Sequence, residues 1–121
     1  MRLELAQIIK LLDCQVVAGA EHLDLNFDEV FAADLMSDVL AFTTPGSLLL
    51  TGLTNVQSVI TAHVAEAKAI VYVRGKRPDA DAVRLADQKG LPLLASPLSM
   101  YTACGRLFAS GLKSHGDREG L

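Results

Sequence analysis

The chain has 121 residues and a formal net charge of −3; half of its residues are hydrophobic and 21% are charged. A chain of this length forms one domain and buries roughly two-thirds of its unfolded surface, so it needs no disulfide or metal to fold. No long basic run is present, which argues against nucleic-acid binding. No apolar run approaches the ~20 residues of a membrane span.

Cysteine and histidine spacing excludes the common metal sites. Cys14 and Cys104 lie far apart without C-x-x-C spacing, and the three histidines form no H-x-x-x-H pair. We therefore expect a reduced, cytoplasmic protein with no metal and no cofactor. Because the apolar fraction is high for so short a chain, we expect part of it to lie in a subunit interface, as in a homodimer.

The hydrophobic pattern predicts strands that alternate with helices. Leu5, Ile8, Ile9 and Leu12 recur with helical spacing, which indicates a helix over about residues 3–13. In chain order we then expect a strand at 14–18, an extended segment at 23–27, a strand at 29–33, a short helix at 34–42, a strand at 47–51, a helix at 55–67, a strand at 69–73, a helix at 79–89, a strand at 91–94 and a helix at 97–112.

This alternation is typical of an α/β fold with a mainly parallel sheet of about five strands and helices on both faces. Ligands of such sheets bind beyond the carboxyl ends of the strands. Four polar segments follow predicted strands and are expected to gather there: residues 34–38, 51–55, 74–77 and 95–99.

The first of these segments contains Asp34, Ser37 and Asp38. Asp34 has the position of a helix N-cap, and Asp38 lies four residues later, so both carboxylates are expected on one helix face. The pair could hold a cation or contact ligand hydroxyls. Alternatively, the two carboxylates only cap the helix and balance its dipole.

The second segment, with Thr51, Gly52, Thr54 and Asn55, is a strand-to-helix turn that contains a glycine. Backbone N–H groups in such a turn can bind phosphate, but neither a Walker nor a dinucleotide-binding glycine pattern is present. Capping of the next helix by Thr54 or Asn55 is the alternative.

The third segment is the most basic part of the chain. Arg74 could clamp a phosphate or carboxylate, Lys76 would add charge, and Gly75 would let the backbone approach closely. The alternative is a solvated loop before the helix that Pro78 begins. In the fourth segment, Ser96-Pro97 has the form of an N-cap followed by proline. The alternative is that the Ser96 hydroxyl faces the ligand crevice.

The last predicted helix carries no evident chemistry. Cys104 shares a face with Tyr101 and Phe108, which predicts that this face packs inward. No nucleophile has an evident base partner anywhere in the chain, so we do not expect an enzyme.

Six segments of the chain are informative when they are taken in order: LAQIIKLLDCQVVAG, ADLMSDVLA, LLLTGLTN, AIVYVRGKRPD, GLPLLAS and YTACGRLF. Together they resemble a DRTGG domain over nearly the whole chain. The resemblance implies a three-layer α/β/α sandwich over residues 1–112, similar to the N-terminal domains of HPr kinase and the Mur ligases. It also implies a regulatory or assembly module of energy metabolism, often dimeric and without catalysis. Relatives occur fused to phosphotransacetylases and CBS-pair pyrophosphatases, or near genes for iron hydrogenases. The polar residues 113–121 are expected to form a flexible tail.

The chain departs from the residues that name this family. Asn55-Val56 stands roughly where Asp-Arg is expected, and Val73-Arg74-Gly75 stands where Thr-Gly-Gly is expected. Only Gly75 clearly persists, so a ligand held by the signature residues in relatives is not implied here. Arg74 in place of a glycine is compatible with an anion site of different chemistry.

Two functions follow from these patterns. The first is a stand-alone, dimeric regulatory domain that binds an adenine nucleotide or another phosphorylated metabolite at the carboxyl ends of the strands. The second is an assembly subunit without a small ligand, which docks to a larger redox complex of the hydrogenase type through its apolar surface. A small enzyme acting on a phosphorylated substrate has the least support.

Overall fold

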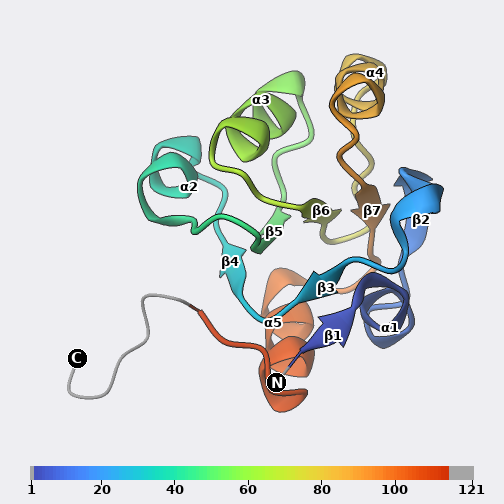
Figure 1. Cartoon of the computed structure of the whole chain (residues 1–121), viewed down its shortest axis with the longest axis vertical. Helices are drawn as coiled ribbons and strands as arrows, with labels where there is room; N and C mark the ends of the chain where they lie inside the picture. Colours follow the sequence, from blue (N-terminus) through green and yellow to red (C-terminus); the bar gives the residue numbers. More distant parts are fainter. Residues whose placement is uncertain (1, 115–121) are drawn as a thin grey trace.

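A computed structural model describes residues 2–114, in which strands and helices alternate as the sequence predicts (Figure 1). The strands are β1 (Leu3–Glu4), β2 (Gln15–Ala18), β3 (Asn26–Phe27), β4 (Val30–Ala32), β5 (Leu48–Thr51), β6 (Ala69–Tyr72) and β7 (Leu93–Ala95). The helices are α1 (Leu5–Leu11), α2 (Met36–Phe42), α3 (Val56–Val64), α4 (Ala80–Lys89) and α5 (Met100–Ala109), with a 3₁₀ turn at Ala20–His22.

Five of the strands form one sheet in the order β2-β7-β6-β5-β4. Strands β4 to β7 are parallel, and each lies beside the strand that follows it in the chain. β2 pairs antiparallel with β7 at one edge, and β1 and β3 form a small antiparallel pair of their own. The prediction of an α/β fold with a mainly parallel sheet of about five strands is confirmed.

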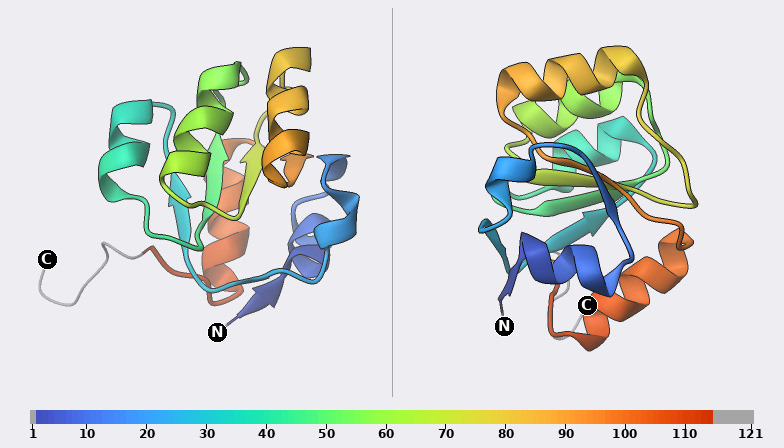
Figure 2. Two further views of the ribbon diagram at one scale, coloured as in Figure 1. Left: turned by 45° about the horizontal axis from the view of Figure 1, so that its top comes forward. Right: turned by 90° about the vertical axis from the view of Figure 1, so that its right-hand side faces the viewer.

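Helices cover both faces of this sheet. α2, α3 and α4 lie on one face, and α1 and α5 lie on the other (Figure 2). Leu48 and Leu50 of β5 belong to the core under α1 and α5, whereas Leu49 belongs to the core under α2, α3 and α4. Side chains alternate between the faces of a strand, so these two cores require three consecutive apolar residues. The three-layer sandwich is therefore confirmed.

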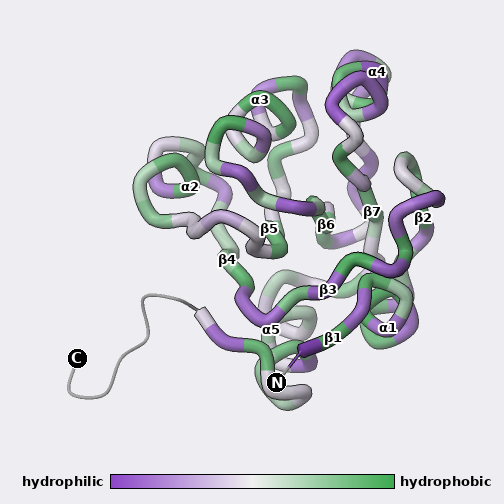
Figure 3. The backbone as a smooth tube through the Cα atoms, in the orientation of Figure 1, coloured by the Kyte–Doolittle hydropathy of each residue, from purple (hydrophilic) through white to green (hydrophobic). Residues whose placement is uncertain are grey.

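Strands β5 and β6 are buried at every position, which explains their nearly continuous apolar sequences. The helices instead combine hydrophobic and hydrophilic residues, which Figure 3 shows clearly along α4. An amphipathic helix of this kind buries one face against the sheet and leaves the other in water.

Several element ends differ from the sequence-based expectation. α1 begins at Leu5 because Leu3–Glu4 pairs with β3 instead of starting the helix. α5 begins at Met100 because Ser99 caps it, with its side chain accepting a hydrogen bond of 3.2 Å from the Thr102 amide. The prediction that Ser96 caps this helix is therefore wrong.

The chain after α5 returns to the sheet at β4. The amide of Val30 donates to the Lys113 carbonyl at 2.8 Å, and the Lys113 amide donates to the Asp28 carbonyl at 3.2 Å. Lys113, which the sequence placed in a flexible tail, is thus paired through its backbone. Residues 115–121 of that tail lie outside the described residues, and the domain boundary after residue 112 stays a prediction. No helix within residues 2–114 has the length and apolar composition needed to cross a bilayer.

Two consecutive residues after β6 adopt left-handed backbone conformations. Arg74 has φ of 64° and Gly75 has φ of 71°. A side chain raises the energy of this conformation by roughly 1–2 kcal/mol, whereas glycine adopts it freely. Arg74 therefore holds a strained backbone conformation in addition to its charge.

Replacement of Arg74 by glycine tests this explanation. We expect R74G to raise the free energy of unfolding by about 0.5–1 kcal/mol, because relief of strain exceeds the added entropy of an unfolded glycine. G75A is the matched opposite change: a Cβ there meets nothing within 4 Å, so the backbone alone should lower stability by about 1 kcal/mol. Urea denaturation measures both variants. A loss of stability in R74G as large as that in G75A would contradict the explanation.

Candidate functional site

The structure brings the four polar segments together at the carboxyl ends of β4 to β7, a region called here the carboxyl edge. The Gly52 amide donates to the Asp34 carboxylate at 2.7 Å, which joins the loops after β4 and β5. The Asp79 amide donates to the Thr54 carbonyl at 2.9 Å, which joins the loops after β5 and β6. The loops after β6 and β7 meet where the Gly75 amide donates to the Ser96 carbonyl at 2.8 Å.

Asp34 does not cap α2, contrary to one interpretation of the sequence. Leu35 holds the N-cap position and contributes no side-chain hydrogen bond. Asp34 precedes the helix, and its Oδ1 instead accepts from the Gly52 amide and, at 3.3 Å, from the Thr51 hydroxyl. The prediction that Asp34 and Asp38 share a helix face is therefore wrong, because only Asp38 lies in the helix.

Ser37 and Asp38 stand apart from this cluster. Both lie in the first turn of α2, with Ser37 exposed and Asp38 half-buried. Within residues 2–114, neither side chain makes a hydrogen bond or an ion pair. Their proposed contact with a ligand is not tested by the geometry and stays a prediction.

The turn after β5 already uses two of the backbone donors that were predicted for a phosphate, the amides of Gly52 and Leu53. The Gly52 amide is bonded to Asp34, and the Leu53 amide donates to the Thr51 hydroxyl at 3.2 Å. Asn55 caps α3, with its Oδ1 accepting from the Gln57 amide at 3.1 Å. An anion could reach the Gly52 amide only by displacing the Asp34 carboxylate.

Residues 74–77, called here the basic loop, are held from two sides. The Arg74 amide donates to the Leu98 carbonyl at 2.7 Å, next to the bond between Gly75 and Ser96. On the other side, Lys76 Nζ donates to the Gly52 carbonyl at 3.2 Å. The exposed Arg74 guanidinium makes no hydrogen bond or ion pair with the described part of the chain, so it is available to a ligand.

A pocket of about 240 Å³ opens between the basic loop and the turn after α1. We call it the edge pocket; its lining residues are Asp13, Gln15, Gly75, Arg77, Ala95, Ser96 and Pro97. Arg77 is fixed beside it because one guanidinium nitrogen donates to Gln15 Oε1 at 2.7 Å.

Of the predicted ligand residues, only Gly75 lines the edge pocket. Arg77 belongs to the same basic run as Arg74 and Lys76, and that run was a signal for it. Gln15 carried no such signal. It reaches the site because β2 is antiparallel, which places the first residue of β2 beside Ala95, the last residue of β7.

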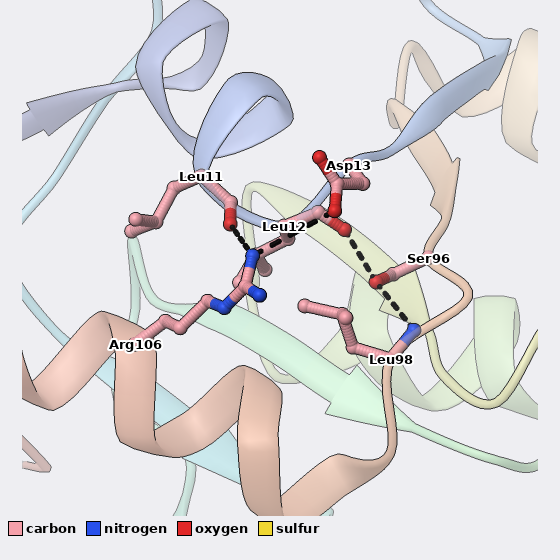
Figure 4. Close-up of polar contacts among 6 residues, drawn as sticks. All are labelled: Leu11, Leu12, Asp13, Ser96, Leu98 and Arg106. Atoms are coloured by element: carbon pink, nitrogen blue, oxygen red, sulfur yellow. Dashed lines mark hydrogen bonds and ion pairs between the residues drawn. The ribbon is translucent and has the colours of Figure 1, made fainter.

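Ser96 and Arg106 fix the wall of the edge pocket that the turn after α1 forms (Figure 4). The Ser96 hydroxyl, fully buried, donates to the Leu12 carbonyl at 2.6 Å and accepts from the Leu98 amide at 3.2 Å. Arg106 of α5 donates to the Leu11 carbonyl at 2.9 Å and lies 3.7 Å from the Asp13 carboxylate. These groups complete the carboxyl end of α1, where carbonyl groups lack partners within the helix.

The pKa values of both cysteine thiols are raised. Burial, together with the charge of neighbouring Asp13, raises the pKa of Cys14 to about 12. Burial also raises the pKa of Cys104. Within residues 2–114, no group of three or more histidine, cysteine or acidic side chains could hold a metal ion.

Comparison with known proteins agrees with the fold. The chain matches the DRTGG domain family over residues 7–110. It is 29% identical over 110 residues to the uncharacterized protein YtoI of Bacillus subtilis (strain 168), a match that covers 88% of this chain and 24% of that protein.

A solved structure with the same fold is the crystal structure of the CBS and DRTGG domains of the regulatory region of Clostridium perfringens pyrophosphatase, complexed with the activator diadenosine tetraphosphate. Its TM-score is 0.73 at 17% sequence identity, and the match covers 90% of this chain and 47% of that chain. The chain thus spans less than half of either relative. Its match over residues 7–110, together with this fold, shows that the chain belongs to the DRTGG domain family.

Proposed function

We propose that this domain is a non-catalytic regulatory module that binds a phosphorylated small molecule at the edge pocket, with an adenine nucleotide as the first candidate. The observation that carries the proposal is Arg77, a guanidinium held by Gln15 at the side of the pocket. A guanidinium offers two parallel donors to a phosphate or carboxylate, which gives both affinity and orientation.

The hydrogen bonds around the basic loop indicate which other groups would be available to the ligand. Because the Arg74 and Gly75 amides already bond to Leu98 and Ser96, the anion would be bound by side chains and not by the backbone. Arg74 adds a second guanidinium on the same loop, and this one has no partner among the described residues. Lys76 is engaged with Gly52, and the Gly52 amide with Asp34, so these groups would contact a ligand only after rearrangement.

The size of the edge pocket limits how much of a nucleotide it can enclose. Pockets for drug-sized ligands typically measure about 300–1,000 Å³, and this one measures about 240 Å³. We infer that the edge pocket holds the phosphate and the small part of the ligand that adjoins it. The base of a nucleotide would lie along the open edge. The complex of the pyrophosphatase regulatory region with diadenosine tetraphosphate makes adenine nucleotides the natural first ligands to test.

Two hydroxyl groups at this edge support a non-catalytic role. Thr51 and Ser96 are both fully buried, and both hydroxyls are engaged in hydrogen bonds. A nucleophile must reach its substrate and have a base to activate it. Both hydroxyls fail the first condition, because both are buried.

Calorimetric titration with AMP, ADP, ATP and acetyl phosphate tests this proposal. We expect at least one of them to bind, and R77Q to weaken that binding about tenfold or more, because a charge-assisted hydrogen bond is lost. R84Q is the control, since it removes the same charge from Arg84, which pairs with Asp81 on the exposed surface of α4. No heat at millimolar ligand with folded protein would refute the nucleotide proposal, and equal affinity in R77Q would refute the site.

A second candidate function is assembly through an apolar surface. The exposed side chains of Tyr101 (88%) and Phe108 (74%) show that the prediction of an inward-facing side of α5 is wrong. Beside Phe108, a hollow of about 260 Å³ lies between β4 and α5, lined largely by apolar residues that include Phe31 and Leu107. We propose that this surface joins two copies of the chain; a larger redox partner is the alternative occupant.

Light scattering of the purified chain tests this second candidate. We expect twice the 12.9 kDa mass of one chain. F108S should shift the mass toward that of a single chain, because a large side chain leaves the interface. V64S is the control, since Val64 is also exposed (61%) but lies on α3. A single-chain mass for the unmodified protein, with no partner captured from its native host, would overturn this candidate.

A further inference from the structure

We propose that Asp34, Gly52 and Lys76 form a latch that couples the basic loop beside the edge pocket to the position of α2. The proposal deepens the proposed function by giving a route from a ligand at Arg77 to a distant surface, and only that ligand step rests on the proposed function. The coupling itself is a property of the unliganded chain.

α2 depends on a contact made outside the helix. It has only seven residues, and its N-cap, Leu35, supplies no side-chain hydrogen bond. Short helices are marginal by themselves, since the first turn costs more than it gains. Among its residues only Val39 is fully buried. The bond from Asp34 to the Gly52 amide fixes the chain two residues before the helix begins.

Gly52 bonds to both other members of the latch. Its amide donates to Asp34 and its carbonyl accepts from Lys76. A Cβ at this position would lie 3.3 Å from Asp34 Oδ1 and 3.5 Å from Lys76 Nζ. Gly52 does not have a left-handed backbone, so the glycine serves to let these two side chains close on the turn. Asp34 and Lys76 form no ion pair with each other in the described structure. They are linked because both bond to Gly52.

Lys76 belongs to the same loop as Gly75 and Arg77, which line the edge pocket. The loop is bonded to Leu98 and Ser96 on one side and to Gly52 on the other. A ligand that draws Arg77 into the edge pocket must therefore move Lys76 or strain the bond from Lys76 to the Gly52 carbonyl. Because Asp34 and Lys76 are both exposed, their bonds can open at modest cost, as a switch requires.

Opening of the latch would change the apolar surface that α2 presents to solvent. Leu35, Leu40 and Phe42 are the large hydrophobic residues that α2 and its N-cap expose to solvent. When the latch opens, the start of α2 is released and these side chains shift with it. The device thus couples an anion site to an apolar surface, which is a coupling free energy between two places on one fold.

Hydrogen exchange of the α2 amides tests the latch without any ligand. We expect the Asp38 and Val39 amides to exchange about fivefold faster in D34A and in K76M, because each variant removes one bond to Gly52. The two effects should not add: the double variant should exchange about as fast as D34A alone. D34N and K76R retain an acceptor and a donor and should restore most of the protection.

R74M is the matched control, since it removes a neighbouring exposed charge that has no partner in the described residues, and it should leave α2 unchanged. The β6 amides report global unfolding, so a variant that merely loses stability would speed exchange there too. Unchanged α2 exchange in K76M, with faster exchange in D34A, would show that the loop is not coupled to α2 and overturn the proposal. Unchanged exchange in both variants would overturn it as well. Because no ligand is present, these outcomes are independent of whether a nucleotide binds.

Discussion

The burial of β5 and β6 on both faces is the constraint from which the rest of the structure follows. Every residue of these two strands is removed from water, so neither strand can present polar chemistry along its length. Polar groups are therefore confined to the strand ends. At the carboxyl edge, the buried hydroxyls of Thr51 and Ser96 pair with Asp34 and with the Leu12 carbonyl, because buried polar groups without partners are costly. The exposed groups of the loops add further bonds, such as those from Gly52 to Asp34 and from Lys76 to Gly52.

The hydrogen bonds among these loops limit how the carboxyl edge could recognise a ligand. Parallel α/β proteins commonly bind phosphate through free backbone amides in the turn after a strand. Here Asp34 occupies the Gly52 amide, and the carbonyls of Leu98 and Ser96 occupy those of Arg74 and Gly75. Under the proposed function, recognition would therefore fall to side chains, above all Arg77.

Local patterns in the sequence predict most of the fold. The apolar runs at β5 and β6 and the helical spacing of α1 are short-range signals, and they placed these elements within a few residues. The four loops were also predicted to meet, because parallel strands end at one edge. The resemblance to the DRTGG family rested on the order of segments, which the fold preserves even where the signature residues differ.

Contacts between residues distant in the sequence leave no such local pattern. Asp34 has the sequence context of a helix cap, and only the neighbouring position of β5 reveals that it bonds to Gly52. Ser96 likewise resembles a cap, but its hydroxyl donates to the carbonyl of Leu12, which lies 84 residues earlier in the chain. Gln15 joins the edge pocket through the antiparallel pairing of β2, which no local pattern encodes. The left-handed backbone of Arg74 was hidden because arginine rarely adopts it.

In the proposed function, an anionic ligand binds at Arg77 while Asp34 keeps the turn after β5 closed to it. Backbone amide resonances followed by NMR during titration with AMP and acetyl phosphate test this directly. We expect the first and largest shifts at Gln15, Gly75 and Arg77. Shifts confined to the amides of residues 52–55, or no shifts at millimolar ligand, would contradict it.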